Sequence, residues 1–168
     1  SVQRGCLAEV ARWSDVPIDD MPIAVDGCGV TVMALPLENM ALAYARWGRA
    51  VTSGDAFALR TATAIRRHPH LLGGTDRFDT VVLQETGGAV ITKVGAEGVH
   101  SVAVPSAGIG LAIKVEDGAL RAQHIAVLRF LQLLDILPAT LPPKLAEWAL
   151  KPIRNTRGEV VGEIRSAQ

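Results

Sequence analysis

Residues 1–70 place their apolar side chains mostly three to four positions apart, the spacing of helices that bury one face. Clusters of Pro, Gly and Asp interrupt this spacing and predict the connections between helices. The elements expected up to residue 85 are a helix over 2–13, a loop over 14–21, a β-rich segment over 23–33, a helix from 36 to 48, a helix from 54 to 68, a turn at 73–74 and a short helix over 76–85. Pro36 suits the first turn of its helix.

The spacing changes after residue 88. Three apolar runs, Ala89–Lys93, Val99–Val104 and Ile109–Val115, are separated by turns that contain Gly or Pro, which predicts an antiparallel meander. Helical spacing returns over 119–134, and residues 153–164 read as a hairpin. Helices, then a meander, then a helix indicate an α+β fold in which helices flank the meander. Residues 1–168 therefore form a single domain or part of one.

Composition narrows the class of protein. The chain has 168 residues, 49% of them hydrophobic, and its 17 Lys plus Arg balance its 17 Asp plus Glu. A net charge of zero argues against nucleic acid as a partner, because phosphate-binding faces gather positive charge. No apolar run is long enough to cross a bilayer, which argues against a membrane protein. Two cysteines without framework spacing favour the reducing cytoplasm over secretion.

The first candidate for chemistry is Lys93, which ends an apolar strand run and is followed by Val94 and Gly95. A small residue at Gly95 allows a substrate or a facing backbone to come close. Desolvation or a neighbouring cation would lower the pKa of such a lysine and enable it to shuttle protons. A solvated lysine at a strand end is the commoner case, so spacing alone favours that reading.

Several blocks in order change this weighting, because together they resemble the asparaginase II family of rhizobial type. The blocks are Asp26-Gly27-Cys28-Gly29, His68-Pro69, Gly73–Arg77, KVGAEGV at 93–99 and GIGLAIKVEDG at 108–118. The resemblance spans nearly the whole chain and corresponds to the C-terminal half of an asparaginase II-like domain. It implies an L-asparagine amidohydrolase with a fold like that of serine β-lactamases and penicillin-binding proteins. The Ala96-Glu97-Gly98 continuation fits the asparaginases better than a penicillin-recognising protein.

Family members use a Ser-x-x-Lys helix as nucleophile and base, faced by a strand lysine, and Lys93 matches that strand lysine. Val94 stands where the lactamase motif has Thr. No Ser-x-x-Lys occurs in this chain, which opens at Ser1 without Met. We therefore expect a fragment, a split subunit or a processed product. Its partner would be a missing N-terminal half or, in a homo-oligomer, a second copy. The alternative is a catalytically silent binding domain.

The remaining candidates are weaker. The resemblance implies a zinc site made by Cys28 with a Cys and a Lys of the missing segment, whereas Cys28 alone is expected to be a free thiol. Arg77 either binds the substrate carboxylate or forms an ion pair with Asp76, Asp79 or Glu116. Glu97 either anchors the ammonium of Lys93 or faces water. The histidines are expected at the surface or at helix caps, and they are His68, His70, His100 and His124.

Overall fold

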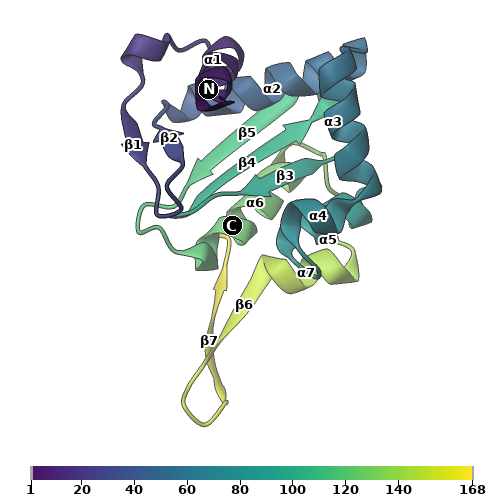
Figure 1. The fold of residues 1–168 in the computed structure, drawn as a ribbon. Helices are drawn as coiled ribbons and strands as arrows, with labels where there is room; N and C mark the ends of the chain where they lie inside the picture. The colour runs from purple at the N-terminus through teal and green to yellow at the C-terminus, as the bar shows by residue number, and fades with distance from the viewer. Residues whose placement is uncertain (1, 168) are drawn as a thin grey trace. The chain divides into compact units, whose positions relative to one another are not determined.

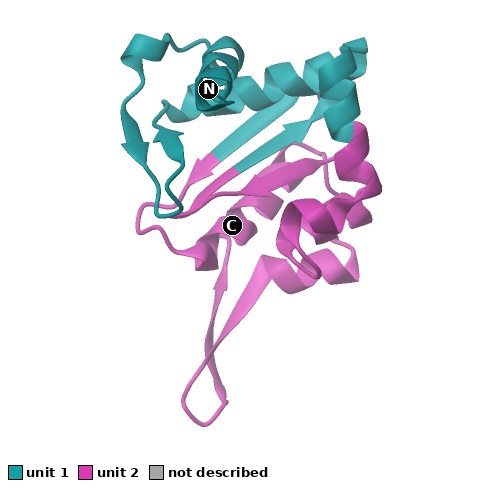
Figure 2. Ribbon diagram, in the orientation of Figure 1, with its two compact units in different colours: residues 1–62, 101–112 teal, residues 63–100, 113–168 magenta. Residues whose placement is uncertain are grey.

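The computed structural model describes residues 2–167 and confirms the α+β class (Figure 1). The chain forms two compact units, which Figure 2 distinguishes by colour. Unit 1 consists of residues 1–62 and 101–112, and unit 2 of residues 63–100 and 113–168. Within residues 2–167, no helix has the length and apolar content needed to cross a membrane.

Unit 1 contains the helices that the helical spacing predicted, and also strands and two 3₁₀ turns. Its elements are α1 (Val2–Ser14), a 3₁₀ turn η1 (Ile18–Asp20), β1 (Ile23–Val25), β2 (Thr31–Met33), α2 (Leu37–Ser53), most of α3 (Ala56–Arg67), the turn η2 (Pro105–Ala107) and parts of β4 and β5. Of these, η1 lies in the segment expected to be a loop. β1 and β2 pair antiparallel, with Ile23 opposite Met33. The β-rich segment is therefore a hairpin, and its two glycines lie in the turn.

The expected end of α2 at Gly48 is wrong, since the helix continues to Ser53. Its true cap is Gly54, which adopts the left-handed conformation with φ of 84° and donates its N–H to carbonyls of the last turn. Gly48 serves packing instead, because a Cβ there would lie 3.3 Å from the Cα of Pro105. A glycine inside a helical pattern costs stability but allows another backbone to come this close.

β5 lies still closer to α2. A Cβ at Gly110 would overlap the carbonyl oxygen of Ala41 and approach the backbone nitrogen of Ala45 to 2.5 Å. Gly110 is therefore required where the strand backbone packs directly on the helix.

Unit 2 contains the remaining elements. They are α4 (Pro69–Gly73), α5 (Phe78–Glu85), β3 (Ile91–Val94), β4 (Val99–Val104, shared with unit 1), β5 (Ile109–Lys114, shared), α6 (Leu120–Leu133), α7 (Pro143–Ala149), β6 (Leu150–Arg154) and β7 (Val160–Arg165). The predicted meander is confirmed, with strand order β3-β4-β5. The C-terminal hairpin is also confirmed, as a separate two-stranded sheet in which Leu150 pairs with Arg165.

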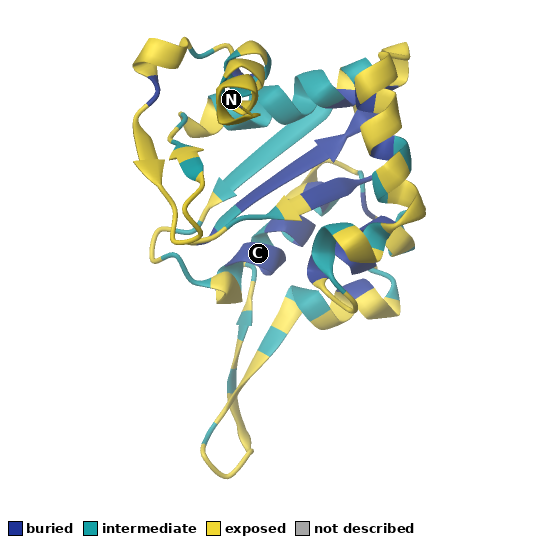
Figure 3. Cartoon of the chain, in the orientation of Figure 1, coloured by how far each residue is buried: buried dark blue, intermediate teal, exposed yellow. Residues whose placement is uncertain are grey.

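The core of unit 2 includes residues of α5, α6 and α7 and is largely aliphatic. Figure 3 shows how far each residue is buried. Val82, Leu128, Leu131 and Leu145 are all at most 1% exposed. Burying side chains of this kind contributes about 1.5–3 kcal/mol each. Polar side chains are buried with them, which the hydrophobic pattern did not predict.

Candidate active site around Lys93

Lys93 is the third residue of β3 and lies in unit 2. Side chains alternate between the two faces of a strand, and here Thr92 is buried whereas Lys93 is exposed. The Lys93 ammonium folds back and donates a hydrogen bond of 2.8 Å to the carbonyl oxygen of Val94. Lys93 is thus one residue before the end of β3, which is Val94. The Lys93 side chain is exposed to solvent, and its ammonium lies beside the backbone of the next residue, Val94.

Gly95 follows β3 and has an internal reason to be small. A Cβ at Gly95 would lie 3.1 Å from the Cβ of Val99 and 3.3 Å from its carbonyl oxygen. Gly95 also donates its backbone N–H to that same oxygen, at 2.7 Å. Of the two partners expected at Gly95, the structure provides a facing backbone, that of Val99.

Glu97 is exposed and adopts a positive φ of 54° in the turn between β3 and β4. Its backbone carbonyl accepts a hydrogen bond of 2.6 Å from the ammonium of Lys114. Within residues 2–167, no ion pair joins Glu97 to Lys93. The structure therefore corresponds to the second expectation, in which the Glu97 carboxylate faces water.

Arg77 is exposed at the N-cap of α5. The alternative in which it pairs with Asp76, Asp79 or Glu116 is not formed within the described part of the chain. Asp79 has other partners. The Arg77 guanidinium thus remains available for a ligand carboxylate, which it could bind with two parallel hydrogen bonds.

Asp79 is a residue that the sequence reasoning missed as a site residue. It lies in the first turn of α5, and its side chain is only 2% exposed. Its Oδ1 accepts a hydrogen bond of 2.6 Å from the Thr92 hydroxyl, and its Oδ2 accepts one of 3.0 Å from the Val94 N–H. The Nε2 of His100 lies 3.0 Å from Oδ1, although neither ring nitrogen has an aligned hydrogen bond within residues 2–167. The Asp79 carboxylate and the His100 ring are therefore in close polar contact without an aligned hydrogen bond.

These partners keep the Asp79 carboxylate charged. Burial by itself raises the pKa of Asp79, but the contacts with His100 and Thr92 and the Val94 N–H together hold it below its usual value. The first turn of a helix also favours a negative charge. A charged, fully enclosed carboxylate therefore lies directly behind the strand that carries Lys93.

The prediction that all four histidines lie at the surface or at helix caps is wrong for two of them. His100 is 0% exposed and His124 is 7% exposed. His124 stacks on Phe78 at 4.4 Å between ring centroids, and Trp148 meets the His124 ring edge-on at 5.0 Å. Burial, followed by the neighbouring His100, lowers the pKa of His124 to about 4. Aromatic packing from α5 and α7 therefore keeps His124 neutral.

Cys28 lies in unit 1, in the turn between β1 and β2, and so in a different unit from Lys93. Its thiol is free and exposed, and Sγ lies 3.9 Å from Oδ2 of Asp26. Within residues 2–167, no cluster of three or more His, Cys, Asp or Glu side chains could hold a metal. One thiol and one carboxylate fall short of the four donors that structural zinc sites usually have.

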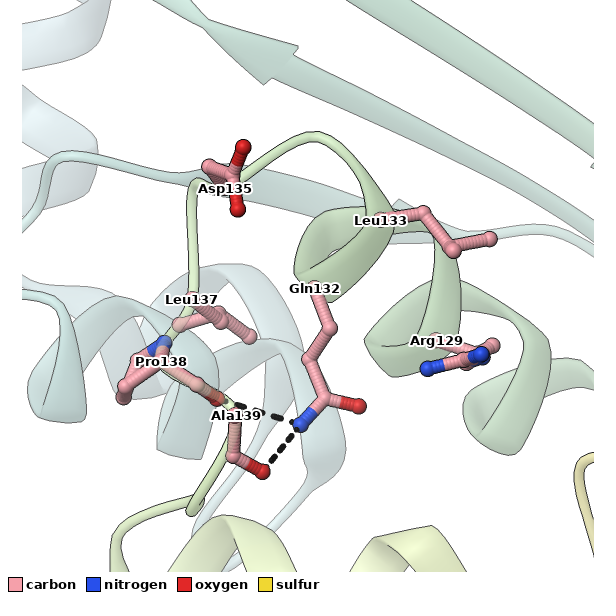
Figure 4. Close-up of a pocket in the computed structure, with 7 residues that line it drawn as sticks. All are labelled: Arg129, Gln132, Leu133, Asp135, Leu137, Pro138 and Ala139. Atoms are coloured by element: carbon pink, nitrogen blue, oxygen red, sulfur yellow. Dashed lines mark hydrogen bonds between the residues drawn. The ribbon is translucent and has the colours of Figure 1, made fainter. Parts of the chain in front are cut away.

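Two surface pockets lie in unit 2. One, of about 500 Å³, is formed by the last turns of α6 and the segment Asp135–Ala139, where Gln132 donates hydrogen bonds to the carbonyls of Pro138 and Ala139 (Figure 4). The other, of about 470 Å³, is lined by charged residues of α7 and by Trp148. Neither pocket is lined by Lys93 or Arg77.

Comparison with known proteins tests the resemblance that the sequence blocks suggested. The family described as L-asparaginase II matches residues 1–166, a span that includes Cys28, Arg77 and Lys93. A search of curated proteins gave no match. The family match extends over nearly the whole chain and confirms the resemblance at the level of the family. The expectation that the chain corresponds only to the C-terminal half is wrong, because the match covers residues 1–166. The chain belongs to the L-asparaginase II family.

Proposed function

We propose that this chain takes part in the hydrolysis of L-asparagine to L-aspartate and ammonia through a serine acyl-enzyme, with Lys93 as the strand lysine of the active site. Family membership supports an asparaginase-type amidohydrolase role in general. The observation that carries the proposal is the family match over residues 1–166. Within that span, Lys93 is an exposed residue of β3, and the buried carboxylate of Asp79 contacts the neighbouring Thr92.

The reaction requires two steps. A serine oxygen attacks the side-chain amide carbon of asparagine, the C–N bond breaks, and the serine proton leaves on ammonia. Water then cleaves the resulting ester, which releases aspartate and restores the serine. Lys93 would either assist proton transfer from the serine or stabilise the charge that develops on the carbonyl oxygen. In both roles its ammonium must first leave the Val94 carbonyl.

The nucleophile must come from outside these residues, because none of the 168 positions begins a Ser-x-x-Lys motif. A second copy of the same chain cannot supply the motif either. A homo-oligomer is therefore compatible with activity only if another segment joins it. We propose only that this segment lies outside the 168 residues, because the family match over residues 1–166 does not support the expectation that the chain is a C-terminal half.

Two further residues belong to the proposal. Arg77, exposed and without an ion pair in the described chain, would bind the α-carboxylate of asparagine. Cys28 would bind zinc only with donors from the other segment, since within residues 2–167 no group of three or more His, Cys, Asp or Glu side chains could hold a metal. Cys6 and Cys28 are both free, which supports a cytoplasmic location.

The alternative is a silent domain that binds without reacting, and the missing Ser-x-x-Lys favours it for the chain alone. The coding region directly upstream of Ser1 distinguishes the two. If an in-frame Ser-x-x-Lys is present there, the longer protein should release ammonia from L-asparagine. Lys93→Ala should abolish that release, whereas Lys144→Ala, a change at an exposed lysine of α7, should not. Equal activity of both variants would contradict the role of Lys93.

A further inference from the structure

Asp79 connects α5 to β3 on both sides of Lys93. Its Oδ1 takes the hydroxyl proton of Thr92, and its Oδ2 takes the backbone N–H of Val94. These two residues directly precede and follow Lys93 in β3. A single carboxylate therefore fixes the strand immediately before and immediately after the lysine.

The geometry keeps Asp79 away from the ammonium itself. Thr92 is buried and Lys93 is exposed, so the two side chains leave the strand on opposite faces. Asp79 contacts the buried face and the backbone, while the ammonium of Lys93 bonds the Val94 carbonyl. Any influence of Asp79 on Lys93 thus acts through the position of the strand.

The carboxylate has little freedom to move. It is enclosed with His100, whose Nε2 lies 3.0 Å from Oδ1 and whose ring meets Phe78 edge-on at 5.4 Å. Phe78 is the residue before Asp79 and is 2% exposed. Since close-packed interiors resist small displacements, strand and helix move together at this point.

We infer that Asp79 is a positioning residue for Lys93: through Thr92 and Val94 it fixes the stretch of β3 from which the lysine reaches the reacting groups. This inference rests on the proposed function, since only a reacting Lys93 needs an exact position. Displacements of about 1 Å in a catalytic group can lower the turnover rate by about a hundredfold. A purely structural Asp79 would instead affect folding alone.

The test changes the partner and not the carboxylate, because removing Asp79 would leave several buried groups unpaired. Thr92→Val keeps the shape of the side chain and deletes the hydroxyl, whereas Thr92→Ser retains the hydroxyl. Thr80→Val is the matched control, since Thr80 is a buried threonine of α5 whose hydroxyl donates to Gly74, at 2.7 Å, and not to β3. All variants are made in the asparagine-hydrolysing form of the protein defined above.

We expect Thr92→Val to lower kcat by about tenfold with KM within about twofold, and to speed amide hydrogen exchange at Val94 by about tenfold. Thr92→Ser should restore both quantities, and Thr80→Val should change neither. The inference is overturned if Thr92→Val leaves kcat unchanged, or if Thr80→Val lowers kcat equally.

Lys93→Ala separates this failure from failure of the proposed function. If Lys93→Ala hydrolyses asparagine as fast as the parent protein, Lys93 has no catalytic role and the positioning role falls with it. If Lys93→Ala is inactive while Thr92→Val has the parent kcat, the proposed function stands and only the role of Asp79 is refuted.

Discussion

Acidification from pH 8 to pH 5 should destabilise unit 2 because His124 is buried. Its pKa is about 4 in the folded chain, against 6.5 for the free side chain. Above pH 6.5 the ring is neutral in both states and contributes no pH dependence. Between 6.5 and about 4 the unfolded chain takes up a proton that the folded chain does not, so the free energy of unfolding falls as the pH falls.

The magnitude follows from the two pKa values. The whole window costs the folded state about 3 kcal/mol, at about 1.4 kcal/mol per pKa unit. At pH 5 about 1.5 pKa units of this window have been crossed, so the cost to the folded state at that pH is about 2 kcal/mol. Because His124 is 7% exposed, solvent screens some of this penalty, so we expect about 1–2 kcal/mol between pH 8 and pH 5.

The assay is urea unfolding at both pH values in a Trp13→Phe, Trp47→Phe background, in which the fluorescence of Trp148 reports on unit 2. His124→Phe keeps the stack on Phe78 and removes the titrating ring. His70→Phe, at an exposed histidine, is the control. His124→Phe should lose about 1–2 kcal/mol less stability on acidification than the parent and the control do. An unchanged pH dependence in His124→Phe would refute the assignment of the effect to His124.

Four further outcomes are expected. Asp79→Asn should lower the free energy of unfolding by about 3 kcal/mol at pH 7, because it breaks a buried charged contact; since the pKa of Asp79 is lowered on folding, the deficit relative to the parent should shrink as the pH falls below 3.8 in the same urea assay. Gly110→Ala should cost about 1–3 kcal/mol or prevent folding, whereas Gly162→Ala, whose Cβ would lie 3.6 Å from its nearest neighbour, should be tolerated in thermal unfolding. The purified chain should lose zinc to a chelator, and Cys28→Ser should change little; stoichiometric zinc that survives in the parent and is lost in Cys28→Ser would contradict a free thiol. The purified chain should release no ammonia from L-asparagine above buffer, and release that Lys93→Ala abolishes would show that the chain needs no other segment.

The meander could be predicted because its signals are local. β4 begins and ends where its apolar run begins and ends, and a glycine or proline marks the turn on each side. The end of α2 could not be predicted in this way. Gly48 looks like a stop, but it lies inside the helix because Pro105, far along the chain, packs against it. A glycine required for tertiary packing and a glycine that ends a helix have the same local pattern.

The sequence selects Lys93 as a candidate site residue but gives no reason to select Asp79. Lys93 stands out because a charge follows an apolar run within blocks that resemble the family. Asp79 has no such signal, since its partners are Thr92, Val94 and His100, between 13 and 21 positions away. An aspartate in the first turn of a helix is ordinarily a solvated favourable charge. Only the fold converts it into an enclosed one.

The tetrapeptide Ile-Thr-Lys-Val of β3 therefore places Thr92 on the buried face of the strand and Lys93 on the exposed face. Its apolar residues and the alternation of side chains along a strand are enough to predict from the sequence that Lys93 is exposed. The same alternation turns Thr92 inward, where its hydroxyl would be costly to bury without a partner. Asp79 is that partner, and as a charged group it is itself stable there only with Thr92, Val94 and His100 around it. The exposed lysine and the buried carboxylate thus belong to the same stretch of strand. Under the proposed function of Lys93, substitutions on the buried face should change kcat without contacting the substrate.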